Sequence, residues 1–188
     1  MPPERKAVAV SGNGKMTLNN FISRLSWRQI ILHSIAFWFF IHAFETFSYL
    51  TDTKLVELFR HSNEQITGKT LEKNGMSVAN MSDLLIGASV AGFIGLGVAF
   101  TISLAISIKR HWLWVNSIIA LLIMFIPVRF GYLHWHYLKQ IFWAPGEIFN
   151  NTKIEFIING IILLTIGLLI FFWRLSNQFI KNNRQVAA

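Results

Sequence analysis

The chain has 188 residues, of which 53% are hydrophobic and 14% are charged. A soluble domain carries about 25% charged residues, so the composition argues against a soluble enzyme or a disordered chain. Cysteine is absent, which excludes disulfides, thiol catalysis, cysteine-ligated zinc and iron–sulfur clusters. The long apolar runs predict a membrane protein. The net charge of +8 then indicates contact with an anionic membrane leaflet and no binding of nucleic acid.

Residues 1–28 form the first predicted region, a cytoplasmic arm. Its beginning is rich in proline and glycine, which predicts a flexible segment. Apolar residues then recur at the spacing of one helix face: Leu18, Phe21, Ile22 and Leu25. This pattern predicts a short amphipathic helix on the inner leaflet. A helix packed on a partner protein fits the pattern equally well.

Four apolar stretches follow, each long enough for a bilayer-spanning helix of about 20 residues. They cover about 29–50, 84–108, 112–133 and 154–173. An outer loop, 51–83, joins the first two, and apolar residues near 55–59 predict a short surface helix within it. Thr152 and Glu155 form a capping-box pattern that predicts the start of the last span. The predicted fold class is all-α, an integral membrane four-helix bundle over 29–174 with a basic cytoplasmic tail, 175–188.

The orientation follows from lysine and arginine near the span ends. Ten basic residues and a single acid, Glu4, lie on the side that holds both termini and the short turn at Lys109, Arg110 and His111. The other side has seven basic residues, spread over longer segments. We therefore expect both termini to be cytoplasmic, in the plasma membrane or in a bacterial inner membrane.

The second span carries small residues spaced by four: Gly87, Ala91, Gly95, Ala99, Ser103 and Ser107. Small residues let helices approach closely in lipid, so this ladder predicts a helix–helix contact along the span. The partner helix could belong to the same chain or to a second copy, and the short turn to the third span favours the same chain. In the third span, Asn116 and Ser117 are expected to bond to neighbouring helices.

The first span carries a polar stripe that includes His42 and Glu45 on one helix face. An ionisable residue inside a membrane is a candidate functional residue and needs a partner. Arg129 is the predicted partner of Glu45. At 1.5 Å per residue the two lie about 25 Å and about 28 Å above the inner edge, near the outer boundary of the hydrocarbon core.

The functional interpretation is a Glu45–Arg129 pair that lines an outward-facing cavity, with His42 one turn deeper. A structural ion pair that fixes helix register explains the same residues. So do two side chains that reach separately to the outer interface.

Histidines also raise the question of a metal. His42, Glu45, His134 and His136 are types that ligate zinc or iron. However, residues at i and i+2 of a helix point apart, so His134 and His136 could ligate together only on an extended segment. A haem is disfavoured because the second and fourth spans lack histidine.

The layout resembles that of DoxX-like proteins, small four-helix membrane proteins with cytoplasmic termini. Residues 108–111 look like that family's tight cytoplasmic turn. Residues 150–153 and the pair Trp173 and Arg174 look like the ends of its last helix. The resemblance covers about residues 29–178 and is architectural; the long outer loop and the N-terminal arm depart from it. It implies an accessory or redox-associated role. Residues 31–40 are also similar to membrane sensor regions of histidine kinases, but no kinase domain follows.

These observations leave three hypotheses open. The leading one is a non-catalytic accessory subunit or small-ligand-binding membrane protein. Its expected partner is the lipid bilayer, and other membrane-protein subunits or a second copy of the chain are candidate partners. The second is a membrane redox subunit that uses a quinone or a metal near His42, Glu45 and Arg129. The third is a small proton-coupled transporter. No cofactor is specified by the residues.

Overall fold

The computed structural model describes residues 25–61, 68–130, 145, 146 and 148–172, with the side chains of all but 59–61 and 127–130. The regular secondary structure in this part of the chain is entirely helical. In chain order the elements are α2 (Trp27–Ser48), the 3-10 helix η1 (Tyr49–Asp52), α3 (Thr53–His61), α4 (Gly68–Lys73), α5 (Val78–Lys109), α6 (Val115–Phe130) and α8 (Thr152–Phe172).

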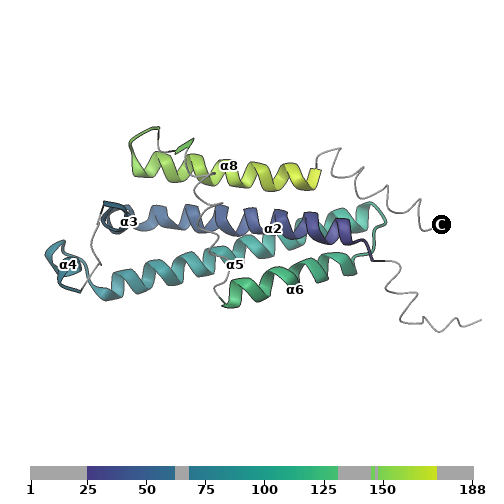
Figure 1. Ribbon diagram of the computed structural model, residues 1–188, viewed down its shortest axis with the longest axis horizontal. Coiled ribbons are helices and arrows are strands. Elements are labelled where there is room, and N and C mark those ends of the chain that lie inside the picture. The colour runs from purple at the N-terminus through teal and green to yellow at the C-terminus, as the bar shows by residue number, and fades with distance from the viewer. Residues whose placement is uncertain (1–24, 62–67, 131–144, 147, 173–188) are drawn as a thin grey trace, which may run out of the picture.

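Helix α2 is the centre of the bundle, with α8 along one side and α5 and α6 along the other (Figure 1). Phe37 and Phe40 of α2 are fully buried, and the ring of Phe171 from α8 packs against them at centroid distances of 6.2 and 5.8 Å. A helix that is apolar on all sides is stable only when it is buried or surrounded by lipid. The central position of α2 fits its apolar residues, which cover most of its circumference apart from the polar stripe that includes His42 and Glu45.

Among the described residues, three helices are long and apolar enough to cross a membrane by length and composition: the continuous stretch Trp27–Leu58 that begins with α2, together with α5 and α8. The outward faces of α5, α6 and α8 expose large apolar side chains, among them Val90, Phe93, Ile94, Leu122, Ile126, Ile161 and Leu169. Soluble monomers rarely expose apolar surface on this scale. The protein is therefore a membrane protein, as its composition predicts.

Helix α6 begins at Val115, three residues after the predicted start of the third span at 112, and is described to Phe130. It is described over 16 residues, whereas a bilayer crossing needs about 20. Residues 131–144 lie outside the described part of the chain, as do residues 18–24 of the predicted amphipathic helix and the tail 175–188. The fourth crossing and the side on which the termini lie therefore stay predictions.

The caps explain where α5 and α8 begin. Ser77 caps α5 by accepting a bond from the Asn80 amide, while the Asn80 side chain accepts from the Ser77 amide, so α5 starts ahead of the predicted residue 84. At α8, the amides of the second and third helical residues donate to Asn151 Oδ1 at 3.0 and 3.2 Å. The predicted cap, Thr152, is wrong by one residue because Asn151 fills that role.

The loop predicted over 51–83 is largely helical where it is described. Leu55 of α3 and Leu71 of α4 are buried and pack with Leu84 of α5 in a small core of their own. This core ties the connection between α2 and α5 to the start of α5, next to the end of α2 that leads into η1.

Candidate functional site

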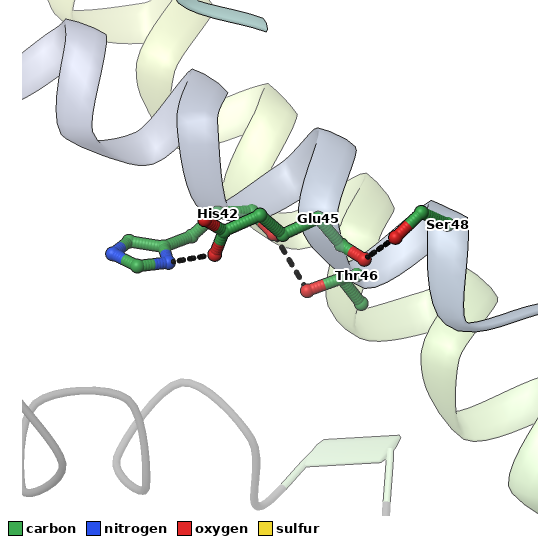
Figure 2. A network of polar contacts seen from close by, with 4 residues as sticks. All are labelled: His42, Glu45, Thr46 and Ser48. Carbon is green, nitrogen blue, oxygen red and sulfur yellow. Dashed lines mark hydrogen bonds and ion pairs between the residues drawn. The ribbon is translucent and has the colours of Figure 1, made fainter. Parts of the chain in front are cut away.

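The candidate site lies in the second half of α2, where His42 and Glu45 are one turn apart. His42 Nδ1 and Glu45 Oε2 are 2.8 Å apart, and Figure 2 shows both side chains on the same flank of the helix. His42 is 5% exposed, whereas the Glu45 side chain keeps 23% exposure. Residues three apart on a helix are neighbours, so α2 forms this contact without help from another element.

Two neighbours shape the surroundings of the pair. The ring of Trp38 meets the His42 ring edge to face, with centroids 4.4 Å apart. On α5, Gly92 lies against Glu45: a Cβ at Gly92 would stand 3.0 Å from Glu45 Oε1 and 3.2 Å from its Cγ. The missing side chain at Gly92 therefore leaves the room that the Glu45 side chain occupies.

The hydroxyl groups next to the pair are already bonded within the helix. Thr46 Oγ1 donates to the His42 carbonyl at 2.6 Å, and Ser48 Oγ donates to the Glu45 carbonyl at 2.7 Å (Figure 2). Such bonds back to the preceding turn are common for serine and threonine inside helices. The imidazole and the carboxylate are therefore the groups at this place that can serve a ligand.

One atom of the pair has no partner. His42 Nε2 is buried and makes no hydrogen bond to the described residues. A carboxylate only accepts, so its bond to Nδ1 puts a proton on Nδ1, and in the neutral imidazole Nε2 then carries the lone pair. A buried polar atom without a partner costs about 1–3 kcal/mol. The site thus has one unused hydrogen-bonding position, which a ligand atom could fill.

The other predicted site residues lie outside the described side chains. Arg129 belongs to α6, but only its backbone is described, and residues 134 and 136 fall in the undescribed segment. Among the described residues, no three histidine or carboxylate side chains are grouped as metal ligands would be. The Glu45–Arg129 pair and a metal site that includes His134 and His136 stay predictions.

The small-residue ladder of α5 differs along its length. Its four members toward the end of α5 are buried: Gly95, Ala99, Ser103 and Ser107. Ala91 is half-buried and Gly87 is exposed, with open space around it. At Gly95 a Cβ would stand 2.6 Å from the Phe40 carbonyl oxygen. In the described part of the chain, the backbone that approaches the ladder closely is therefore that of α2.

A second polar cluster, which the sequence does not reveal as a unit, joins α2, α5 and α6 at their other end. Gln29 Nε2 donates to Ser107 Oγ at 2.8 Å, and Asn116 Nδ2 donates to Gln29 Oε1 at 2.8 Å. Three more contacts extend it: Ser107 to Ser117 at 3.0 Å, Ser103 to Ser117 at 2.8 Å, and His33 Nδ1 to Ser103 at 2.6 Å.

This cluster stabilises the bundle and is not a candidate ligand site, because its residues are buried and bond to one another. A satisfied buried network fixes how helices are rotated and shifted relative to each other. Its residues recur at i and i+4, as in Gln29 and His33 or Ser103 and Ser107. That spacing is the signal in the sequence, but it does not show which helix faces meet.

Comparison with protein-family models, with curated proteins and with solved structures finds no match to the chain. The resemblance to DoxX-like proteins therefore stays a prediction, and the site is interpreted from its own geometry.

Proposed function

We propose that this protein crosses the plasma membrane or a bacterial inner membrane four times, with both termini in the cytoplasm. We further propose that it binds a small ligand at His42 without catalysing a reaction. The three apolar helices and the exposed apolar faces support the membrane setting. The positions of lysine and arginine support the orientation.

The observation that carries the ligand site is the unpartnered Nε2 of His42. Its other ring nitrogen is held by Glu45 at 2.8 Å, which fixes the ring, and the Trp38 ring packs against it. The same arrangement, a histidine held by a carboxylate with its far nitrogen free, orients histidines that bind ligands or metals. The described residues contain no group of three histidine or carboxylate side chains that could hold a metal ion here.

The chemistry of the site favours an apolar molecule that carries a hydroxyl group. A hydroxyl can donate to Nε2 of a neutral imidazole and can accept from Nε2 of a protonated one. The apolar body of such a molecule would leave the lipid phase at little cost and pack near Trp38. Alcohols, phenols and hydroquinones belong to this class.

Native mass spectrometry of the protein extracted gently from its own membrane tests the proposal. We expect a bound small-molecule mass on the unmodified chain that is lost in His42→Phe, which keeps an aromatic ring beside Trp38 but removes Nε2. Ser34→Ala is the matched control: it removes another buried, unpartnered polar atom of α2 and should keep the adduct.

Three other outcomes would favour a different site or function. An adduct that persists in His42→Phe would contradict the site. A bound quinone or metal would favour the redox hypothesis, and copurifying subunits without an adduct would favour an assembly role.

A further inference from the structure

The turn between α5 and α6 has an unusual cation. Helix α5 ends at Lys109, and the backbone reverses at His111, whose φ is +53°. The Trp112 amide then donates to the Ser107 carbonyl at 2.8 Å. The Trp112 ring is 5% exposed and lies 6.4 Å, centroid to centroid, from the ring of His33 on α2. The guanidinium carbon of Arg110 stands 5.1 Å from the centre of the Trp112 ring.

Arg110 has no counter-ion in the described part of the chain. Arg110 as a whole is half-buried, and its Nη1 is buried without a hydrogen bond to any residue that the structure describes. Burial lowers the pKa of the guanidinium from the ordinary value. An arginine nevertheless stays charged in proteins. Stacking on the Trp112 ring fixes the guanidinium and contributes on the order of 1 kcal/mol. It does not supply an acceptor for Nη1, which stays without one among the described residues.

The sequence offers almost no acid that could serve. No aspartate or glutamate occurs between Leu84 and Gly146, or after Glu155. On the predicted cytoplasmic side, Glu4 is the single acid against ten basic residues. The chain itself therefore offers little negative charge near Arg110.

The surroundings of the turn indicate what supplies this charge. Ser26 and Asn116 are hydrogen-bonded at 3.3 Å, which places the start of α2 and the start of α6 at one level. At this level Trp27, Ile108 and Trp114 expose more than half of their surface. Exposed tryptophans at the ends of apolar helices are typical of the membrane interface, where lipid headgroups lie.

We propose that Arg110, held on the face of Trp112, binds the phosphate of an anionic phospholipid at the turn between α5 and α6. Basic residues between transmembrane helices on the cytoplasmic side are suited to such headgroups. The guanidinium offers a planar pair of donors to two phosphate oxygens. This inference rests on the turn and is independent of the ligand proposed at His42.

The test is native mass spectrometry of the detergent-purified full chain, titrated with phosphatidylglycerol or with phosphatidylcholine. The unmodified chain should bind phosphatidylglycerol in preference. Arg110→Gln should bind it about tenfold more weakly, since a hydrogen bond to a charged group contributes on that order. Lys109→Gln is the matched control: it removes the same charge from the exposed neighbouring residue and should bind like the unmodified chain.

Arg110→Lys guards against misfolding because it keeps the charge at the end of α5. It should also bind more weakly, since lysine lacks the planar fork and the stacking geometry. Equal phosphatidylglycerol affinity in the unmodified chain and Arg110→Gln would overturn the proposal, as would equal affinity for phosphatidylcholine. Displacement of the lipid by millimolar inorganic phosphate would assign the site to a free anion and would overturn the lipid as its occupant.

Discussion

His42 and Asn116 are both buried polar residues of apolar helices, but their hydrogen bonds separate their roles. Asn116 donates to Gln29 Oε1 and accepts from the Ser26 amide, so it joins α6 to α2 through both ends of its side chain. His42 bonds through one ring nitrogen and leaves the other unpaired. The first pattern stabilises the bundle, whereas the second leaves a position for a ligand.

Asn116→Ala should destabilise the bundle. It leaves Gln29 Oε1 without its donor and the half-buried Ser26 amide without its acceptor, and a buried polar group without a partner costs about 1–3 kcal/mol. Unfolding of the purified protein in mixed micelles measures the change. Thr101→Val is the control, because Thr101 is exposed and bonds only to the Gly97 carbonyl of its own helix; a loss as large as that of Asn116→Ala would contradict the role given to the network.

Residue spacing predicts some contacts and not others for a geometric reason. His42 and Glu45 lie on one helix, so their positions three apart are enough to bring them together. The network of Gln29, Ser107 and Asn116 joins three helices, and its geometry depends on how each helix is rotated about its axis. Spacing within single helices does not contain that information. The sequence therefore predicts that Asn116 and Ser117 bond to neighbouring helices but does not identify their partners.

At the level of the helices, α2 and α5 approach each other closely at one glycine and not at another. A Cβ at Gly95 would stand 2.6 Å from the Phe40 carbonyl oxygen, and this neighbour is backbone that cannot rotate away. Two residues later, Gly97 is exposed, and a Cβ there would meet nothing within 4 Å. The two glycines therefore provide a matched pair within one helix.

Gly95→Ala should separate α2 from α5 and lower the free energy of unfolding by about 1–3 kcal/mol, the usual cost of overpacking. Gly97→Ala should be neutral or stabilising by up to about 1 kcal/mol, because alanine is the better helix former. Both are measured by unfolding in the same micelles. Equal effects of the two substitutions would show that the contact at Gly95 is not formed.

Hydropathy predicts the long helices because the length of an apolar run can be counted directly from the sequence. Their ends depend on caps, which are local hydrogen bonds. The cap at Ser77 starts α5 at Val78, ahead of the long apolar run, and so the predicted start at residue 84 falls inside the helix. The ladder of small residues lies on a packed face from Gly95 to Ser107. Nearer the start of α5 the same face is no longer covered, and Gly87 is exposed.

On the scale of the whole molecule, the two proposed sites lie toward opposite ends of the bundle. His42 and Glu45 are near the end of α2 that leads into η1, whereas Arg110 is at the end where α2 and α6 begin (Figure 1). In a membrane this separates a ligand site near one leaflet from a lipid-phosphate site at the other. With both termini in the cytoplasm, as we propose, the lipid-phosphate site lies at the inner leaflet and the ligand site lies nearer the outer one.

The most direct test is labelling of single cysteines by a membrane-impermeant maleimide, since the chain has no cysteine of its own. Lys73→Cys, Lys109→Cys and Ile148→Cys place the label at exposed positions on successive connections. We predict that residues 73 and 148 react in intact cells and that residue 109 reacts only after permeabilisation. If residue 148 is instead protected together with residue 109, α6 does not cross the membrane and the four-span account is wrong.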